Sequence, residues 1–441
     1  MLTNPVIISV AVMTILALLK VNILIAIFIA AIVAGLAAGM PIATTMGTLI
    51  GGMGGNSETA LSYIMLGAMA VAISHTGIAD FLIRGMSSAF KDKKKLFILI
   101  IAGIACFSQN LIPVHIAFIP ILIPPLLGLM NKMRIDRRAV AAALTFGLKA
   151  PYVVLPIGFG GIFHTIIVKA LVENGVEVTK SQVMPAMLLP GLGMLIGLLI
   201  AIFFSYSKDR DYADQPIAGL DDVEQEHSST FNRKHLGALL GAVAAFGIQI
   251  IFVKMDWSGG LPLGALAALI IMMAFGSFTF KEFDKIMSGG IGLMGFIAFV
   301  MLIAAGYGAV LRETGAVVEL VEASASILGG SKVISALVML LIGLLVTMGI
   351  GSSFSTIPII ATLFVPLGVQ LGFSPAAIIA LVGTAGALGD AGSPASDSTL
   401  GPTSGLNADR QHDHIWDTCI PTFLHFNIPL IIFGVIAAII L

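Results

Sequence analysis

The stretch GDAGSPASDST at residues 389–399 decides the fold. It carries two carboxylates, Asp390 and Asp397, in a segment interrupted by glycine and proline, and the apolar segment 375–388 leads directly into it. An ionisable side chain inside a membrane span is costly and therefore indicates a functional site by default. An interrupted helix at that depth also needs protein or a water-filled cavity around its backbone.

The composition is that of an integral membrane protein. Of the 441 residues, 58% are hydrophobic and only 11% are charged, whereas soluble domains carry about 25% charged residues. Apolar runs long enough to span a bilayer, about 20 residues each, recur along the chain. The formal net charge of −1 argues against a nucleic-acid partner, which usually selects a basic face. The expected partner is the lipid bilayer.

The sequence lacks the motifs of several enzyme classes. It has no GxxxxGKS or GxxxxGKT phosphate loop, no GxSxG nucleophile elbow and no His/Cys cluster with metal-ligand spacing. We therefore expect no enzyme activity and no cofactor, with Na+ or H+ as the coupling ion.

The two halves of the chain resemble one another, which indicates an internal repeat. MLGAMAVAISHTGIADFL (65–82) aligns with MLIAAGYGAVLRETGAVVEL (301–320), and both carry Thr-Gly near the end. KAPYVVLP (149–156) aligns with ALGDAGSP (387–394), and both end on proline. The resulting division is a first repeat at 1–206, a cytoplasmic linker at 207–235 and a second repeat at 236–441.

Basic residues accumulate in short cytoplasmic loops and so give the orientation. The interrupted segment 96–130 has KDKKK (91–95) before it and KMRIDRR (132–138) after it. Both of its ends are therefore expected in the cytoplasm, and its short legs predict a re-entrant hairpin. The corresponding segment 333–371 has only Lys332 in its flanks, so this second hairpin is expected to enter from outside.

The expected fold class is an all-α polytopic membrane protein with two inverted-topology repeats. Each repeat should hold five transmembrane helices, of which one is broken (139–171 and 375–404), and one re-entrant helical hairpin. Secondary transporters use this arrangement, with the substrate site near the midplane where broken helices meet. The expected spans are 5–19, 21–39, 60–83, 139–171, 183–206, 236–253, 261–279, 289–311, 375–404 and 417–441.

Asp390 and Asp397 are candidate ligands for Na+. A carboxylate is a hard oxygen ligand, Ser393 and Ser396 add neutral oxygens, and carbonyls freed by the break can complete the ion's shell. The alternative is an interfacial loop with ordinary capping residues. The apolar flank and the matching break in the other repeat favour the functional interpretation.

The tips of the two expected hairpins are further candidates for ion or substrate binding. Polar side chains beside helix ends can ligate ions or hold a substrate carboxylate at a helix N-terminus. Plain turn chemistry is the alternative, because Asn, Ser and Pro favour turns. The candidates are Asn110 at the first tip and Ser353, Ser355 and Thr356 at the second.

Lys149 aligns with Ala387, close to Asp390. It can neutralise Asp390 or Asp397 in the empty state or pair with an anionic group of the substrate, and a buried lysine can release its proton readily. A fixed buried ion pair that joins the repeats is an equally good interpretation. His115 follows the first tip and is a candidate proton relay, although a lone histidine among apolar residues is more often packed and hydrogen-bonded.

GDAGSPASDST, followed by Gly405, Asp409 and His414, resembles the signature of NhaC-type sodium/proton antiporters. NPVIISV (4–10) and ALSYIMLGAMAVAISHTGIADFL (60–82) are similar to the N-terminal region of a subgroup labelled as sodium/proton antiporters. The resemblance implies the ion-transporter superfamily fold, often as a homodimer, in the cytoplasmic membrane of a prokaryote. It also implies a cation role for Asp390 and Asp397. Relatives include exchangers and carriers of organic acids or amino acids, histidine among them, so the cargo stays open.

The leading functional hypothesis is Na+/H+ antiport by alternating access. Burial favours a protonated carboxylate and a nearby cation favours an ionised one, so Na+ binding at Asp390 or Asp397 would expel the proton. The alternative is a Na+- or H+-coupled amino-acid transporter with a histidine-like substrate, held at the hairpin tips or by Lys149. The paired breaks disfavour a passive channel, and the missing catalytic motifs disfavour a membrane enzyme.

Overall fold

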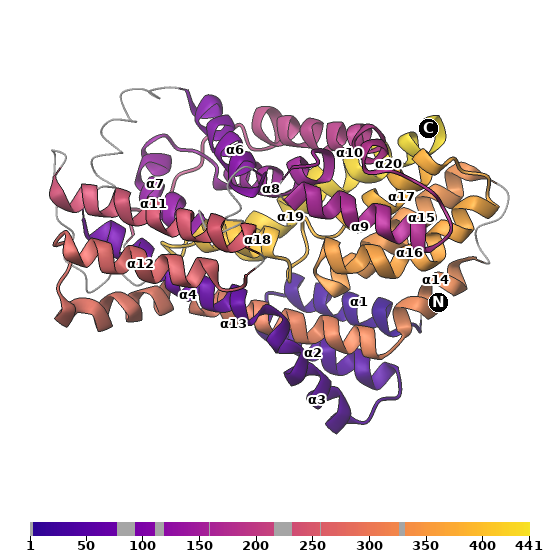
Figure 1. The fold of residues 1–441 in the computed structure, drawn as a ribbon, viewed down its shortest axis with the longest axis horizontal. Helices are drawn as coiled ribbons and strands as arrows, with labels where there is room; N and C mark the ends of the chain where they lie inside the picture. Colours follow the sequence, from indigo (N-terminus) through magenta and orange to yellow (C-terminus); the bar gives the residue numbers. More distant parts are fainter. Residues whose placement is uncertain are drawn as a thin grey trace.

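The computed structural model describes residues 3–76, 93–110, 119–157, 159–215, 232–255, 257–325 and 331–441. Within these ranges the chain is helical and contains no β-strand. Most helices run roughly along the longest axis of the molecule, and helices from the two halves of the sequence lie side by side (Figure 1). The all-α class expected from the sequence is therefore confirmed.

The first half of the chain folds into helices of uneven length. They are α1 (Pro5–Leu18), α2 (Ile23–Ala37), α3 (Ile42–Met53), the 3-10 turn η1 (Gly54–Asn56), α4 (Ser57–His75), α6 (Lys94–Asn110), α7 (Ile119–Lys132), α8 (Arg137–Val154), α9 (Phe159–Glu173), α10 (Lys180–Ile200) and the π-helical turn η3 (Ala201–Ser205).

The second half has the same character. Its elements are α11 (Arg233–Lys254), α12 (Gly260–Ala274), η4 (Phe280–Glu282), α13 (Phe283–Glu313), α14 (Ala316–Ala325), α15 (Lys332–Ile350), α16 (Ser353–Gln370), α17 (Pro375–Ala387), α18 (Asp397–Leu406), η5 (His414–Cys419), α19 (Ile420–Thr422), η6 (Phe423–Asn427) and α20 (Ile428–Ile440).

Six helical segments in the described part of the chain are long and apolar enough to cross a membrane on their own. Two bent pairs raise this number to eight: α8 with α9, and the two parts of α16, each bent by 47°. The unbroken candidates are Ile42–His75, Lys180–Ser205, Arg233–Phe252, Phe280–Glu313, Lys332–Ile350 and His414–Ile440.

The ten expected spans do not map one to one onto these segments. Residues 42–56, expected to lie between spans, are helical and continue into α4. Helix α15, expected as one leg of a re-entrant hairpin, has 19 residues and is long enough to cross alone. The tip of the first expected hairpin, including His115, lies outside the described residues. The inverted-repeat topology stays a prediction.

Small residues let helices from the two halves approach closely, as is usual between membrane helices. Helix α4 packs along α13, and Gly67 faces Gly290 at this contact. A Cβ atom on Gly67 would lie 2.7 Å from the Gly290 carbonyl oxygen, and one on Gly290 would lie 2.3 Å from the Ala68 nitrogen. The two glycines therefore set the distance between the helices.

Two sets of contacts bring the interrupted segments to the centre of the molecule. Helix α6 packs on α8 in the first half, and α15 packs on α17 in the second. Across the halves, α7 contacts α18 and α9 contacts α16. The region between α17 and α18 is thereby surrounded by helices of both halves.

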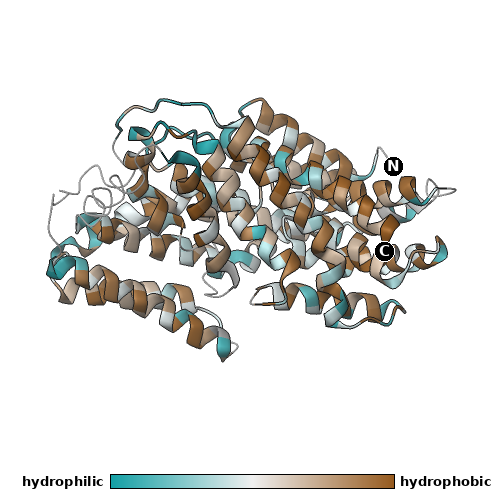
Figure 2. Cartoon of the chain, turned by 90° about the horizontal axis from the view of Figure 1, so that it is seen from above, coloured by the Kyte–Doolittle hydropathy of each residue, from teal (hydrophilic) through white to brown (hydrophobic). Residues whose placement is uncertain are grey.

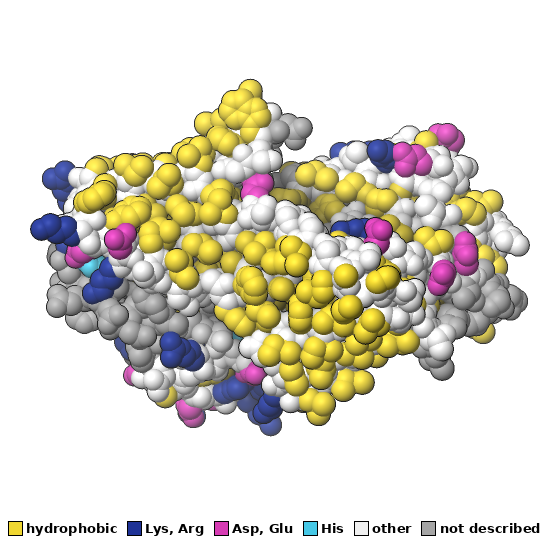
Figure 3. All heavy atoms as spheres, turned by 90° about the horizontal axis from the view of Figure 1, so that it is seen from below, with side chains coloured by type: hydrophobic (Ala, Val, Ile, Leu, Met, Phe, Trp, Pro, Cys, Tyr) yellow, Lys and Arg dark blue, Asp and Glu magenta, His cyan; other side chains and the backbone are white. Residues whose placement is uncertain are grey.

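The surface carries the apolar side chains expected of a membrane protein. The helices are predominantly hydrophobic, and hydrophilic residues gather toward their ends and connections (Figure 2). Hydrophobic side chains cover much of the face in Figure 3, with most Lys and Arg toward its edges. Phe204, for example, is 75% exposed. Large apolar side chains are favourable at a surface only where they contact lipid or another apolar partner. The chain is a multi-pass membrane protein.

The beginning of the linker is held against the body of the protein. Arg134 forms a bidentate hydrogen bond with Asp211 at 2.6 and 2.8 Å, and Arg210 donates to Asp417 at 2.7 Å. Residues 216–231, including the acidic stretch 221–227, lie outside the described part.

Candidate substrate and cation site

The break between α17 and α18 depends on glycine. Helix α17 ends at Ala387, Leu388 is extended, and α18 begins at Asp397. Gly389 and Gly392 have φ angles of 78° and 97°, which residues with a Cβ rarely adopt. A Cβ would also lie 2.6 Å from the Leu344 carbonyl oxygen at the first position and 2.6 Å from the Phe423 Cα at the second. Substitution of either glycine therefore forces the loop away from its packing partners.

Side chains from several elements hold this loop, here called the break loop (388–396). The Asn427 amide accepts from the Gly389 nitrogen at 3.0 Å and donates to the Ala391 carbonyl at 2.6 Å. Ser398 donates to the Asp390 carbonyl at 2.8 Å, and Thr399 donates to the Ser393 carbonyl at 2.5 Å. Carbonyls expected to be free for a cation thus already accept hydrogen bonds. Satisfied buried backbone groups stabilise a defined loop conformation.

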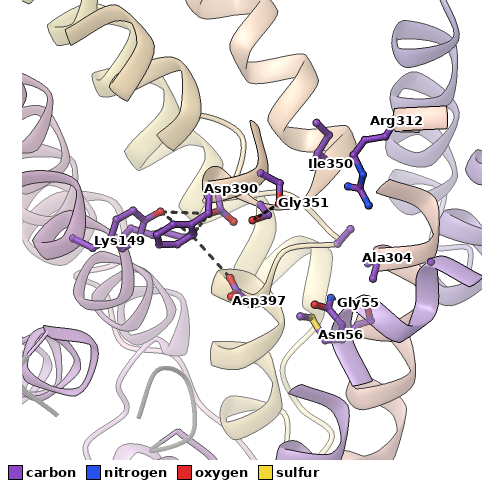
Figure 4. A pocket seen from close by; sticks show the side chains of 17 residues that line it. Gly55, Asn56, Lys149, Ala304, Arg312, Ile350, Gly351, Asp390 and Asp397 are labelled. Atoms are coloured by element: carbon purple, nitrogen blue, oxygen red, sulfur yellow. Dashed lines mark hydrogen bonds and ion pairs between the residues drawn. The ribbon is translucent and has the colours of Figure 1, made fainter. Parts of the chain in front are cut away.

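Lys149 and Asp390 form a buried ion pair (Figure 4). Their side chains are only 6% and 3% exposed. Asp390 also accepts hydrogen bonds from Ser396 and, at 2.6 Å, from Ser353. Both carboxylate oxygens of Asp390 are therefore engaged, and its charge is neutralised. The pair joins α8 of the first half to the break loop of the second.

Tyr152 completes the surroundings of this pair. It lies one helical turn after Lys149 on α8, and its hydroxyl accepts from the Lys149 ammonium at 3.1 Å. The same hydroxyl is 2.9 Å from the Ser353 hydroxyl and 3.4 Å from Asp390. This network satisfies the polar atoms that burial removes from water.

Asp397 is the more accessible of the two acids. It is the first residue of α18, where the helix dipole favours a negative charge. Its side chain is 27% exposed, and its carboxylate lies 3.9 Å from the Lys149 ammonium and 3.4 Å from the Ser396 hydroxyl. A solute or cation in the space beside the break loop therefore reaches Asp397 before Asp390.

That space is a cavity of about 300 Å³, here called the central cavity. Elements of both halves form its wall, and the break loop, the start of α16 and the last turn of α13 meet around it (Figure 4). Its polar and charged lining residues are Asn56, Lys149, Tyr152, Arg312, Ser352, Ser355, Asp390 and Asp397.

The other predicted site residues have different positions. Ser355 is exposed and lines the central cavity. Thr356 is buried and donates to the Ser352 carbonyl at 2.8 Å, and Ser393 is buried and accepts from the Ala395 nitrogen at 3.2 Å. These two hydroxyls stabilise backbone and do not line the cavity. The side chain of Asn110, like His115, lies outside the described residues.

The central cavity offers hard ligands. Carboxylate and hydroxyl oxygens suit Na+ better than soft transition metals. In the described part of the chain, no group of three or more His, Cys, Asp or Glu side chains is placed to hold a metal ion. The cavity can therefore bind an alkali cation, a proton or a small solute with charged groups, and it has no donor set of the kind that holds zinc.

Sequence reasoning missed three residues of this region: Tyr152, Asn427 and Arg312. Tyr152 could have been found from its spacing of three residues from Lys149, because residues at i and i+3 share a helix face. Asn427 is a polar residue in the otherwise apolar end of the chain, which is a recognised signal in membrane helices. Arg312 ends an apolar segment of the sequence, and no sequence signal places it beside the break loop.

Three further residues that carried the resemblance, Gly405, Asp409 and His414, lie at the end of α18 and just after it. The His414 imidazole donates to the Pro394 carbonyl at 2.9 Å. Asp409 forms a buried pair with Arg137, with two oxygen–nitrogen distances of 2.6 Å. Gly405 lies against Ile119 and Ile123 of α7, where a Cβ would come within 2.8 Å of both side chains. Their positions give them a structural role around the site.

A polytopic helical protein with a discontinuous helix, buried charges at the break and a solute-sized cavity beside them belongs to the class of secondary transporters. The chain belongs to the Na+/H+ antiporter family. The model of that family matches residues 143–435, and a second model, described as Na+-H+ antiporter family, matches residues 4–90. Membership in a transporter family also agrees with the expectation that the protein is not an enzyme.

Several bacterial proteins are similar to this chain over nearly its whole length. A membrane protein of Vibrio parahaemolyticus is 52% identical over 99% of this chain and 100% of its own. The Bacillus subtilis protein named "Putative amino acid transporter YuiF" is 48% identical over 99% of this chain and 100% of its own. A membrane protein of Haemophilus influenzae is 47% identical over 99% of both chains.

Two solved transporter structures show a distant likeness. The YdaH transporter of Alcanivorax borkumensis has a TM-score of 0.43 at 15% identity, and the alignment covers 90% of this chain and 88% of that one. MtrF of Neisseria gonorrhoeae has a TM-score of 0.40 at 16% identity, with 90% and 84% covered.

Proposed function

We propose that this secondary transporter carries a small carboxylated solute of the amino-acid class through the central cavity, coupled to Na+ or H+. The observation that carries the proposal is the cavity itself. Its volume of about 300 Å³ is at the lower end of the range for small-molecule pockets and exceeds what a single directly ligated cation needs. Its wall also carries charges of both signs, which suits a solute with both an anionic and a cationic group.

The Lys149–Asp390 pair supports different roles for the two acids, Asp390 and Asp397. Both oxygens of Asp390 are engaged by Lys149, Ser353 and Ser396, so binding of Na+ there would require the pair to open. Asp397 is more exposed and is the better candidate for direct contact with a cation. We therefore assign the coupling cation to Asp397. The Lys149–Asp390 ion pair separates only when the site changes conformation.

Alternating access is the transport mechanism that this arrangement favours. The corresponding contacts of α6 with α8 and of α15 with α17 support the expected repeat, whose two halves would move against one another and expose the site to each face in turn. Bacterial relatives support a location in the cytoplasmic membrane. The expected homodimer stays a prediction.

Na+/H+ exchange without an organic solute is the second candidate function. It is favoured by the name of the family model that covers residues 143–435. In that case Asp397 alternates between a bound Na+ and a bound proton, and the Lys149–Asp390 pair keeps the rest of the site neutral. The amino-acid function is favoured by the printed name of the Bacillus subtilis relative and by the volume of the cavity.

Reconstitution of the purified full chain into proteoliposomes tests the two candidates. Uptake of each of the twenty standard L-amino acids is measured with a Na+ gradient, with a pH gradient and with neither, and the internal pH is followed in parallel. Gradient-driven accumulation of an amino acid supports the first candidate. Na+-dependent proton movement with no amino-acid uptake overturns it in favour of the second.

An acid on the surface provides the control for the role of Asp397. Asp397→Asn should abolish cation dependence in either case, because the amide cannot replace the charge. Glu173→Gln should leave transport unchanged, since Glu173 is 61% exposed, forms only a surface pair with Lys169 at 3.8 Å and does not line the central cavity. Full cation coupling in Asp397→Asn would overturn the assignment.

A further inference from the structure

Arg312 stands apart from the other charged residues of the central cavity. It lies in the last turn of α13, its side chain is exposed, and it lines the same cavity as Asp397. In Figure 4 Arg312 is on the side of the cavity opposite Asp390 and Asp397. Among the described residues it forms no hydrogen bond or ion pair. A cation is favoured at a helix C-terminus, but this preference does not explain why Arg312 borders a cavity.

Lys149 is a poor alternative as a binding group for an anion. Its side chain is 6% exposed, and its ammonium is paired with Asp390 and bonded to Tyr152. A solute carboxylate at Lys149 would have to displace Asp390, which would leave a buried carboxylate without a partner at a large energetic cost. Arg312 can accept a carboxylate with no such exchange, and its planar guanidinium matches a carboxylate with two parallel hydrogen bonds.

The opposite wall provides the complement for a cationic group. Asp397 has the more exposed carboxylate of the two acids, and Asn56 also lines the cavity. The Asn56 amide nitrogen donates to the Met301 carbonyl at 3.0 Å. The amide oxygen can therefore accept a hydrogen bond from a cationic group of the solute. Much of the remaining lining is small, because Gly52, Gly55, Ala304, Ala305, Gly351 and Ala395 line the cavity beside the larger Met301, Ile350 and Phe354. An α-amino acid with a side chain can therefore lie across the cavity.

We propose that the central cavity binds a zwitterionic α-amino acid in one orientation, with its carboxylate at Arg312 and its ammonium at one carboxylate oxygen of Asp397. The other oxygen of Asp397 then holds the coupling cation, while Lys149 and Asp390 stay paired. This inference rests on the proposed amino-acid function and adds the residue that recognises the carboxylate. It makes Arg312 the determinant of selectivity for free amino acids over their carboxamides. The side chain of the solute then decides only which amino acid is preferred.

Equilibrium binding to the purified full chain tests this orientation. The twenty L-amino acids are screened by their effect on thermal unfolding, because a ligand of the folded state stabilises it. Dissociation constants for the best amino acid and for its carboxamide are then measured by titration calorimetry. The wild-type protein should prefer the free acid, and Arg312→Gln should weaken binding of the acid roughly 10- to 100-fold with little change for the carboxamide. The selectivity between the two ligands should therefore nearly disappear.

Two further variants control for charge and position. Arg312→Lys keeps the charge and should retain part of the selectivity. Lys254→Gln removes an exposed cation at the end of α11 that does not line the cavity, and it should bind both ligands like the wild type. If wild-type protein binds amino acids but Arg312→Gln keeps the full preference for the free acid, the orientation is wrong and the proposed function stands. If wild-type protein binds no amino acid, both are overturned.

Discussion

Lys149 on α8 and Asp390 in the break loop form a buried ion pair across 241 residues of sequence. The pair links α8 to the interrupted segment of the second half, together with the hydrogen bond from Thr145 to the Ser398 carbonyl. It explains how a carboxylate is tolerated among apolar helices, because its charge is compensated where it lies. It also fixes the empty state of the site, in which Asp390 is not available to a cation.

Removal of one member of this pair should destabilise the protein. Lys149→Met leaves Asp390 as an uncompensated buried charge, which costs about 3–5 kcal/mol. Thermal unfolding of the detergent-purified protein should show a clear decrease in midpoint. The double variant Lys149→Met with Asp390→Leu should recover much of this loss, because no isolated charge remains. A single variant as stable as the wild type would mean that the pair is not closed in the ground state.

The same double variant separates the two interpretations of Lys149. If the pair only compensates charge, a stable double variant should still bind the amino acid, because Arg312 and Asp397 are intact. Loss of binding in a folded double variant would show that a member of the pair contacts the solute. Titration calorimetry beside the thermal measurement distinguishes these outcomes.

Asn427→Ala should loosen the break loop. The variant leaves the Gly389 nitrogen and the Ala391 carbonyl without their partner, and an unsatisfied buried group costs about 1–3 kcal/mol. Asn174→Ala is a matched control, because Asn174 makes one bond, to the Ala170 carbonyl, at a partly buried helix end. The decrease in unfolding midpoint should be larger for Asn427→Ala. Equal decreases would show that the loop does not depend on this amide.

Gly389→Ala should be more harmful than the same change at a glycine of similar conformation elsewhere. Gly39 has a φ angle of 75°, close to the 78° of Gly389, but no atom lies within 4 Å of a Cβ built there. Gly39→Ala therefore carries only the conformational cost, about 1–2 kcal/mol. Gly389→Ala adds a contact of 2.6 Å with the Leu344 carbonyl oxygen. Unfolding midpoints that decrease by the same amount would contradict the tight packing of the break loop.

Much of the architecture is readable from the sequence because the cost of burying polar groups in lipid acts on every residue. Long apolar runs require helices, and the glycine and proline of residues 389–399 mark a place where the helix is interrupted. Residues 388–396 are indeed non-helical between α17 and α18. Other boundaries were less readable: residues 42–56, expected between spans, are helical and continue into α4, because their mixture of glycine, threonine and apolar residues fits either a loop or a helix.

The candidate site was only partly accessible to the same reasoning. The sequence nominated Asp390, Asp397, Ser396, Lys149 and Ser353, and the structure brings all five together. It also nominated Thr356 and Ser393, whose hydroxyls stabilise backbone instead. A hydroxyl in a break can face either a ligand or the loop's own carbonyls, and residue type does not separate the two.

The sequence by itself determined that this is a helical membrane protein with two acids at an interruption of a helix, because hydropathy and helix-breaking residues are local properties. Only the tertiary structure decided which acid is neutralised and which is accessible, and that Arg312 lies across the central cavity from Asp397. The accessibility of a charge depends on which distant helices pack around it, and contacts such as that of Lys149 with Asp390 form only when the two halves of the chain come together.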